Sequence, residues 1–196
     1  EEISKVGTQP IIGTQINFMF NDEIGTLPLI AKNKIGYETI LKLSSDSYLQ
    51  NNDNSLPYCK IKNLIEKPEG LIVLSGSLYS LSGKFYLKNK LNDLSEFYSL
   101  ISMHFKNDFY LEIQRHGDQN EKQFEQFNLS ISNKLNIPII ATHEVFYIDK
   151  SMHEAHDALL CIKNKTYIND KDRLKLSSNH NFKNNEEMMA LFSDLP

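Results

Sequence analysis

The chain has 196 residues, of which 40% are hydrophobic and 23% are charged, and its formal net charge is −4. This length and composition are typical of an ordinary globular protein with enough residues for one sizeable core. They argue against a surface that binds nucleic acid by itself, because phosphate binding needs a clustered excess of lysine and arginine. No apolar run approaches the roughly 20 residues of a membrane-spanning helix.

The chain has two cysteines, Cys59 and Cys161, which lie far apart and form no CxxC pair. The sequence therefore predicts neither a disulfide framework nor a thiolate zinc site. No signal-peptide pattern is present at the start. We expect a reducing, cytoplasmic location.

The first residues, EEISKVG, are typical of the last turn of a helix, with Gly7 as its left-handed stop. Because the sequence starts inside a helix–strand unit and without methionine, we expect an N-terminally truncated fragment of a longer protein. Strands are expected at residues 10–18, 27–32, 71–75, 109–114 and 137–142. Runs 71–75 and 137–141 are almost wholly apolar, as in strands of parallel sheets that are covered on both faces.

Helices are expected between these strands, at residues 35–49, 91–105, 124–135, 151–162 and 185–195, because apolar side chains recur there at steps of three and four. The last helix is preceded by a capping pattern, Asn184 with Glu187 three residues later. Residues 163–183 show neither periodicity and are expected to form an extended surface segment. The alternation predicts an α/β fold in a single domain, residues 1–196, with right-handed crossovers.

Metal-binding residue types gather at the ends of two predicted strands. In FYLEIQRHG (109–117), a period of two places Glu112 and His116 on one strand face. His143 and Glu144 end the next strand, and strand C-terminal ends form the functional mouth of an α/β barrel. Imidazole and carboxylate ligands suit zinc, manganese or iron. The structural alternative is that each strand-end histidine is hydrogen-bonded to a loop.

Other catalytic patterns are not met. His153 and His156 are three residues apart, whereas the zinc-protease motif needs histidines four apart on a helix. We expect Met152, Ala155 and Leu159 to face inward, His156 to be packed beside them and His153 to face water. The stretch LSGSLYSLSGK (74–84) matches no phosphate-binding loop, and no GxSxG elbow is present.

The order of phrases along the chain resembles one known family. PIIGTQINF, LIAKNKIGYETILKL, GLIVLSGS, FYLEIQRHG, NIPIIATHEVFYI, AHDALLCI and NNEEMMALFSDLP together resemble the PHP (polymerase and histidinol phosphatase) domain of bacterial replicative DNA polymerase III alpha subunits, which are C-family polymerases. The resemblance covers nearly all of the chain. It implies a distorted (β/α)7 barrel of the PHP type, here incomplete because the first strand unit, with a His-x-His pair, is expected upstream of Glu1.

The resemblance also implies where a metal site would lie and that it is degenerate. Gln15 stands at a position where the family has an acidic residue, and Thr26 and Phe146 stand where it has histidines. A catalytic metal site needs three or more protein ligands, so no catalytic residue is expected in this segment and no metal is firmly predicted. The vestigial metal-site positions are Gln15, Thr26, Glu112, His116, His143, Glu144 and Phe146, and the candidate ligands that remain are Glu112, His116, His143 and Glu144.

The implied function is DNA-directed DNA synthesis in chromosomal replication, performed by the full-length nucleotidyltransferase with Mg²⁺ bound outside this segment. The segment alone is expected to be an inactive scaffold that docks the proofreading exonuclease (epsilon) subunit. The sliding clamp and primer–template DNA would be bound through other regions, and no membrane contact is expected. Two alternatives stay open: a metal-dependent phosphoesterase or 3′–5′ exonuclease acting through the four candidate ligands, and a free-standing binding barrel.

Overall fold

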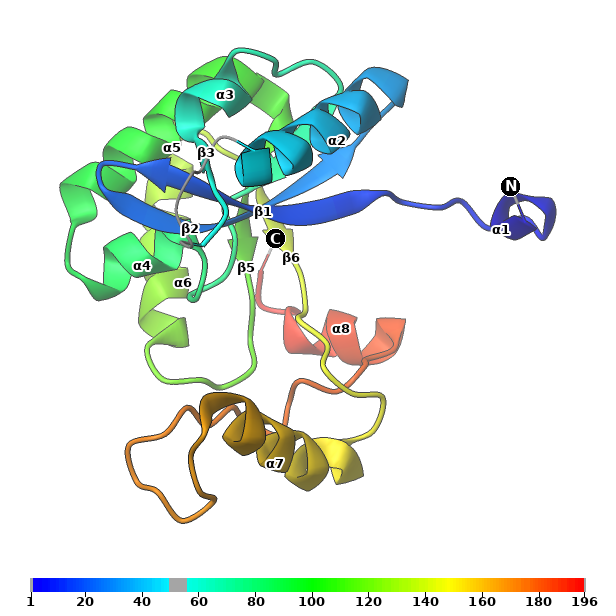
Figure 1. Ribbon diagram of the computed structural model, residues 1–196, viewed down its shortest axis with the longest axis vertical. Coiled ribbons are helices and arrows are strands. Elements are labelled where there is room, and N and C mark those ends of the chain that lie inside the picture. Colours follow the sequence, from blue (N-terminus) through cyan, green and yellow to red (C-terminus); the bar gives the residue numbers. More distant parts are fainter. Residues whose placement is uncertain (1, 50–55, 196) are drawn as a thin grey trace. The chain divides into compact units, whose positions relative to one another are not determined.

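The computed structural model describes residues 2–49 and 56–195 (Figure 1). The chain divides into two compact units. Unit 1 comprises Glu1–Glu112 and Phe127–Ile140, and unit 2 comprises Ile113–Gln126 and Ala141–Pro196. The interpretation of residues 1–196 as a single domain stays a prediction, and each unit is described by itself.

Six strands form one sheet in the order β3-β1-β2-β4-β5-β6. Their bounds are Gly13–Phe20 (β1), Glu23–Ala31 (β2), Cys59–Lys60 (β3), Leu71–Leu74 (β4), Phe109–Ile113 (β5) and Ile139–Ala141 (β6). The α/β class is confirmed, and the described strands form an open sheet, which agrees with a distorted barrel of the PHP type. The parallel pairing expected for the apolar runs holds between β4 and β5, but β1–β2 and β2–β4 are antiparallel, so the sheet is mixed.

Strands β1 and β2 form a hairpin that the sequence analysis did not predict. Asn21 and Asp22 connect them with φ values of 43° and 64°, as in the type I′ turns that match the twist of paired strands. Alternate side chains on one face of the hairpin are buried, among them Phe18, Leu27 and Leu29. The two strands extend over eight and nine residues, and helices of unit 1 contact them.

The described helices of unit 1 lie around this sheet, except α1, which lies apart from it at the end of an extended segment (Figure 1). They are α1 (Glu2–Lys5), α2 (Lys34–Leu49), α3 (Ile61–Ile65), α4 (Leu81–Leu87) and α5 (Leu91–Phe105), followed by the short 3-10 helix η1 (Lys106–Asp108). Helix α6 (Glu121–Leu135) belongs to unit 2 at its start and to unit 1 from Phe127. The expected helices at α2, α5 and α6 are confirmed, as is the left-handed stop at Gly7, whose φ is 80°.

Helix α4 was missed because it lies in the glycine- and serine-rich stretch 74–84. Its Leu81 and Phe85 are fully buried. A Cβ added at Gly25 of β2 would lie 2.5 Å from the Cα of Leu81. The helix therefore packs against β2 at a distance that only glycine permits.

Unit 2 contains η2 (Lys150–Met152), α7 (His153–Asn164) and α8 (Asn185–Leu191). The predicted capping box is confirmed, since the Asn184 side chain accepts from the N–H of Glu187 and the Glu187 carboxylate accepts from the N–H of Asn184. Helix α8 ends at Leu191, four residues earlier than expected. Among the described helices, none has the length and apolar character that crossing a membrane requires.

The Glu23 carboxylate of unit 1 predicts a measurable pH dependence of stability. Hydrogen bonds from Lys88 and Lys90 lower the pKa of Glu23 below its ordinary value of 4.5. A carboxyl group with a lowered folded-state pKa contributes stability above its unfolded pKa and loses it as the pH falls through the folded pKa. Because the two lysine side chains are 55% and 39% exposed, solvent screening limits the contribution to about 1 kcal/mol.

We therefore expect Glu23→Gln to lower the free energy of unfolding by about 1 kcal/mol at about pH 7 and by almost nothing at about pH 3. Urea unfolding of both proteins at the two pH values measures this difference. A difference that stays the same at both values would contradict the assignment.

Candidate functional site

The loop after β5 is held by the first turn of α6. The Glu121 carboxylate accepts hydrogen bonds from the backbone N–H of His116 and of Gly117, each at 2.7 Å. Its other oxygen lies 2.9 Å from Nδ1 of His116. Gly117 has a φ of 82°, in the left-handed region that glycine adopts readily. A carboxylate is also favoured at a helix N-terminus. Because Glu121 bonds both the loop backbone and the His116 ring, it fixes the two in place together.

His116 is a buried ring, 2% exposed, whose two nitrogens are both hydrogen-bonded. Its Nε2 accepts from the backbone N–H of Glu144 at 3.2 Å. Since a backbone N–H can only donate, Nε2 carries the lone pair and Nδ1 carries the proton that faces Glu121. His116 is therefore a neutral histidine that is hydrogen-bonded to neighbouring loops. This is the alternative to metal binding that the sequence left open.

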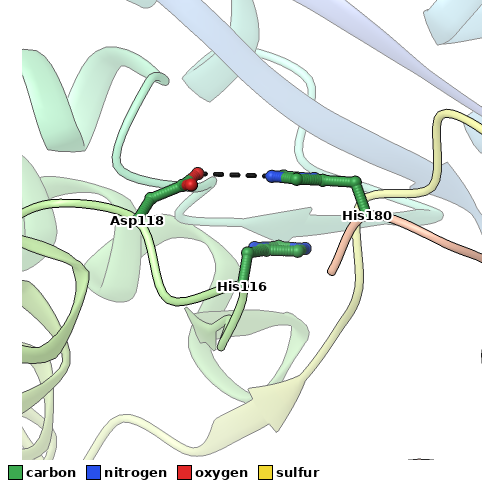
Figure 2. A group of neighbouring side chains, drawn as sticks. All are labelled: His116, Asp118 and His180. Atoms are coloured by element: carbon green, nitrogen blue, oxygen red, sulfur yellow. Dashed lines mark hydrogen bonds and ion pairs between the residues drawn. The ribbon is translucent and has the colours of Figure 1, made fainter. Parts of the chain in front are cut away.

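His180 lies beside His116 and is 1% exposed (Figure 2). Its Nδ1 is 3.1 Å from the carbonyl oxygen of Glu144, and its Nε2 is 3.3 Å from Oδ2 of Asp118. Both partners offer acceptor oxygens, so each ring nitrogen of His180 faces an oxygen that can accept a hydrogen bond from it. Burial would raise the pKa of Asp118, but hydrogen bonds from His180 and from the N–H of Ser177 outweigh it and hold that pKa below its ordinary value.

Aromatic rings form a stack around this pair. The centroids of His116 and His180 are 3.9 Å apart with an interplanar angle of 4°, and those of His116 and His143 are 4.5 Å apart at 30°. Phe146 packs against His180 at 5.0 Å and against His156 at 5.0 Å. Burial is the largest cause that lowers the pKa of His143 to about 4. The His143 ring is therefore neutral near pH 7, which limits like-charge repulsion in the stack.

The other predicted positions lie in unit 1. Gln15 is exposed and Thr26 is half-buried. They share one face of the hairpin, since Thr26 pairs with Asn17, two residues along β1 from Gln15.

Glu112 is a buried residue of unit 1, 6% exposed. Its N–H donates to Oγ of Ser75 at 2.9 Å, and its carbonyl accepts from the side chain of Asn128 at 3.5 Å. Asn128 in turn accepts from the hydroxyl of Tyr98 at 3.0 Å. Glu112 thus belongs to a network of buried hydrogen bonds, which stabilises a core when its groups are satisfied.

Three donors of unit 2 lie close enough together to be compared with the ligands of one metal ion. His116, Asp118 and His180 offer ligand atoms within 4.8 Å of one another, and their types suit zinc or manganese. An imidazole binds a metal along a lone pair in its ring plane, about 2.0–2.1 Å from zinc. Two rings stacked at 3.9 Å and 4° cannot both place the same ion in their planes. With their nitrogens also hydrogen-bonded, these residues do not fit a shared ion.

The sequence analysis named four of the unit 2 residues that lie together here: His116, His143, Glu144 and Phe146. It missed Asp118, Glu121 and His180. The spacing His-x-Asp at 116–118 and an acid in the first turn of a helix are signals that could have found the first two. His180 lies in segment 163–183, which was expected at the surface but buries His180 and Asn181.

The expectation for α7 was partly wrong. His153 is half-buried and its Nε2 is 3.1 Å from the carbonyl oxygen of Leu176, so it does not simply face water. Met152 and Leu159 were expected inward but are 48% and 62% exposed. His156 is half-buried and packs between aromatic rings, as its expected packed role requires.

Comparison with known proteins gives two findings. Residues 1–116 match the family model described as PHP domain. The chain is 38% identical over 193 residues to a DNA polymerase III subunit alpha of Rickettsia bellii (strain RML369-C), an alignment that covers 98% of this chain and 16% of that relative. It is 34% identical over 194 residues to the protein of the same name from Vibrio cholerae serotype O1, covering 97% of this chain and 17% of the relative. The chain thus spans about one sixth of the length of these curated relatives.

Proposed function

Because the chain belongs to the PHP domain family, we propose that it is the PHP domain of a DNA polymerase III alpha subunit and acts in chromosomal replication. The observation that carries this proposal is the similarity to alpha subunits along 98% of the chain. The activity of the whole protein would be DNA-directed DNA synthesis. Its Mg²⁺ ions would be bound by carboxylates outside this segment.

Within such a polymerase, the proposed role of this segment is a non-catalytic scaffold that docks a separate proofreading exonuclease. The donor chemistry supports this role. Gln15, Thr26 and Phe146 are poor or absent ligands at positions where a metal site would need them. The remaining imidazoles of His116 and His180 face hydrogen-bond partners at both nitrogens.

The proposal is tested by assaying the full-length protein on a labelled primer–template with Mg²⁺, Mn²⁺ or Zn²⁺. We expect primer extension without digestion of the primer by this protein alone. Adding the separately purified proofreading exonuclease of the same organism should introduce digestion, and the two proteins should co-elute in gel filtration. A Glu144→Gln variant should behave like the unchanged protein, because no step of extension or docking depends on that carboxylate.

The second candidate is a metal-dependent phosphoesterase or 3′–5′ exonuclease. The observation in its favour is the proximity of donor atoms from His116, Asp118 and His180. It predicts primer digestion by the protein alone and loss of that digestion in the Glu144→Gln variant. That result would replace the scaffold proposal.

A further inference from the structure

Three stretches of unit 2 that are distant in sequence meet at the histidine pair. They are the loop 114–118, the loop 142–147 and residues 176–182, which we call the strap. The carbonyl oxygen of His116 accepts from Oγ of Ser177 at 2.6 Å and from Nδ2 of Asn179 at 2.8 Å. Asp118 accepts from the N–H of Ser177 at 3.1 Å. These bonds attach one end of the strap to the loop 114–118.

The other end of the strap is attached to the loop 142–147. The N–H of Phe146 donates to the carbonyl of His180 at 3.0 Å, and the N–H of Phe182 donates to the carbonyl of Tyr147 at 2.8 Å. His143 Nε2 is 3.0 Å from the carbonyl of Asn181 and donates to it. The strap thus pairs with this loop through backbone bonds at His180 and Phe182.

The backbone of Glu144 lies at the centre of this arrangement. Its N–H donates to His116, and its carbonyl accepts from His180. The two rings lie parallel, one above the other, and Asp118 points toward His180 from the side (Figure 2). The backbone of one residue is therefore bound by both histidines, its N–H by His116 as acceptor and its carbonyl by His180 as donor.

We propose that His116 and His180 form a metal-free clasp that holds the strap against the two loops of unit 2. In the clasp, the rings of His116 and His180 stack, and His116 accepts a hydrogen bond from the backbone of Glu144 while His180 donates one to it. Asp118 holds Nε2 of His180, and Glu121 orients His116. Hydrogen bonds and ring stacking thus perform the closing role that a structural ion performs in other folds.

This inference goes beyond the proposed function, because it concerns what closes unit 2 whatever the longer polypeptide does. A bound ion would have to take ring nitrogens that now hold Glu144, Glu121 and Asp118. Metal binding and the clasp are therefore mutually exclusive arrangements of the same side chains. This exclusion makes the proposal testable with chelators and metals as well as with variants.

Hydrogen exchange followed by mass spectrometry of the full-length protein tests the clasp. His180→Phe keeps an aromatic ring against His116 and Phe146 but removes both ring nitrogens and their hydrogen bonds. We expect exchange in peptides covering 142–147 and 176–182 to rise about tenfold, as the loss of one or two buried hydrogen bonds implies. The matched control is His104→Phe in α5, whose ring, within the described part of the chain, is bonded only to a carbonyl of its own helix. It should leave both peptides unchanged.

Two further arms use the unchanged protein and do not depend on a variant folding. Treatment with EDTA should leave exchange in both peptides the same, and added Zn²⁺ should not slow it. Faster exchange after chelation, or slower exchange with Zn²⁺, would replace the clasp by a metal centre. Unchanged exchange in His180→Phe would show that the hydrogen bonds do not hold the strap. Primer extension and exonuclease docking would be unaffected by either outcome, so the proposed function is tested separately.

Discussion

Replacing Arg115 by alanine is expected to lower the free energy of unfolding by about 3 kcal/mol and to release α8 from unit 2. The guanidinium donates to both oxygens of Glu125 at 2.6 and 2.9 Å, pairs with Asp194 and donates to the carbonyl of Leu191 at 2.8 Å. It also lies 5.1 Å from the ring centroid of Phe192. Alanine would leave the Glu125 carboxylate, 12% exposed, without its cation.

Urea unfolding measures the loss, and limited proteolysis after α8 detects its release. Arg115→Lys keeps the charge but cannot form the two-pronged contact, so we expect about half the loss. Lys5→Ala is the control for an exposed pair, since Lys5 and Glu2 are 65% and 87% exposed, and should change stability by less than about 0.5 kcal/mol. A loss for Arg115→Ala as small as that control would contradict the role of Arg115.

Glu121→Ala is the second large effect, with an expected loss of about 3 kcal/mol. The alanine removes the acceptor for two backbone N–H groups and for Nδ1 of His116 in one step. Without it, His116 can turn, and the bond from the N–H of Glu144 to Nε2 is lost as well. Urea unfolding gives the energy, and exchange of the peptide covering 142–147 reports the second bond.

Glu121→Gln separates the loss of the backbone hydrogen bonds from the loss of the hydrogen bond to Nδ1 of His116. Its amide oxygen can still accept from the backbone, but its NH₂ group would face the protonated Nδ1 of His116. We expect a smaller loss of stability than for alanine, with the same increase in exchange at 142–147. If the peptide covering 142–147 exchanged at the same rate in the unchanged protein, Glu121→Ala and Glu121→Gln, then Glu121 would not orient His116.

Much of the fold could be predicted from the sequence because apolar periodicity records burial. It placed α5 at its observed bounds and β4 and β5 within one residue of theirs. The β1–β2 hairpin was missed, because its turn depends on positive φ at Asn21 and Asp22 rather than on glycine. The antiparallel direction of β2 could not be predicted either, because a strand buries alternate residues in the same way beside parallel and antiparallel partners.

The position of the candidate site could be predicted from the sequence, but the hydrogen-bonding role of each side chain in it could not. His116, His143 and Glu144 were found because they end predicted strands. The role of His180 depends on contacts across more than 60 residues with Asp118, and segment 163–183 has no periodicity that would indicate burial. The tautomer of His116 depends on one backbone N–H that no sequence pattern records.

The metal content of the full-length protein tests the central claim most directly. The protein would be produced in medium supplemented with zinc and manganese, purified without a histidine tag, and measured by inductively coupled plasma mass spectrometry before and after exchange into metal-free buffer. The account predicts far less than one equivalent of either metal per chain, the same in the unchanged protein and in Asp118→Asn. One tightly held equivalent that disappears in Asp118→Asn would contradict it and assign the histidine pair to a metal centre.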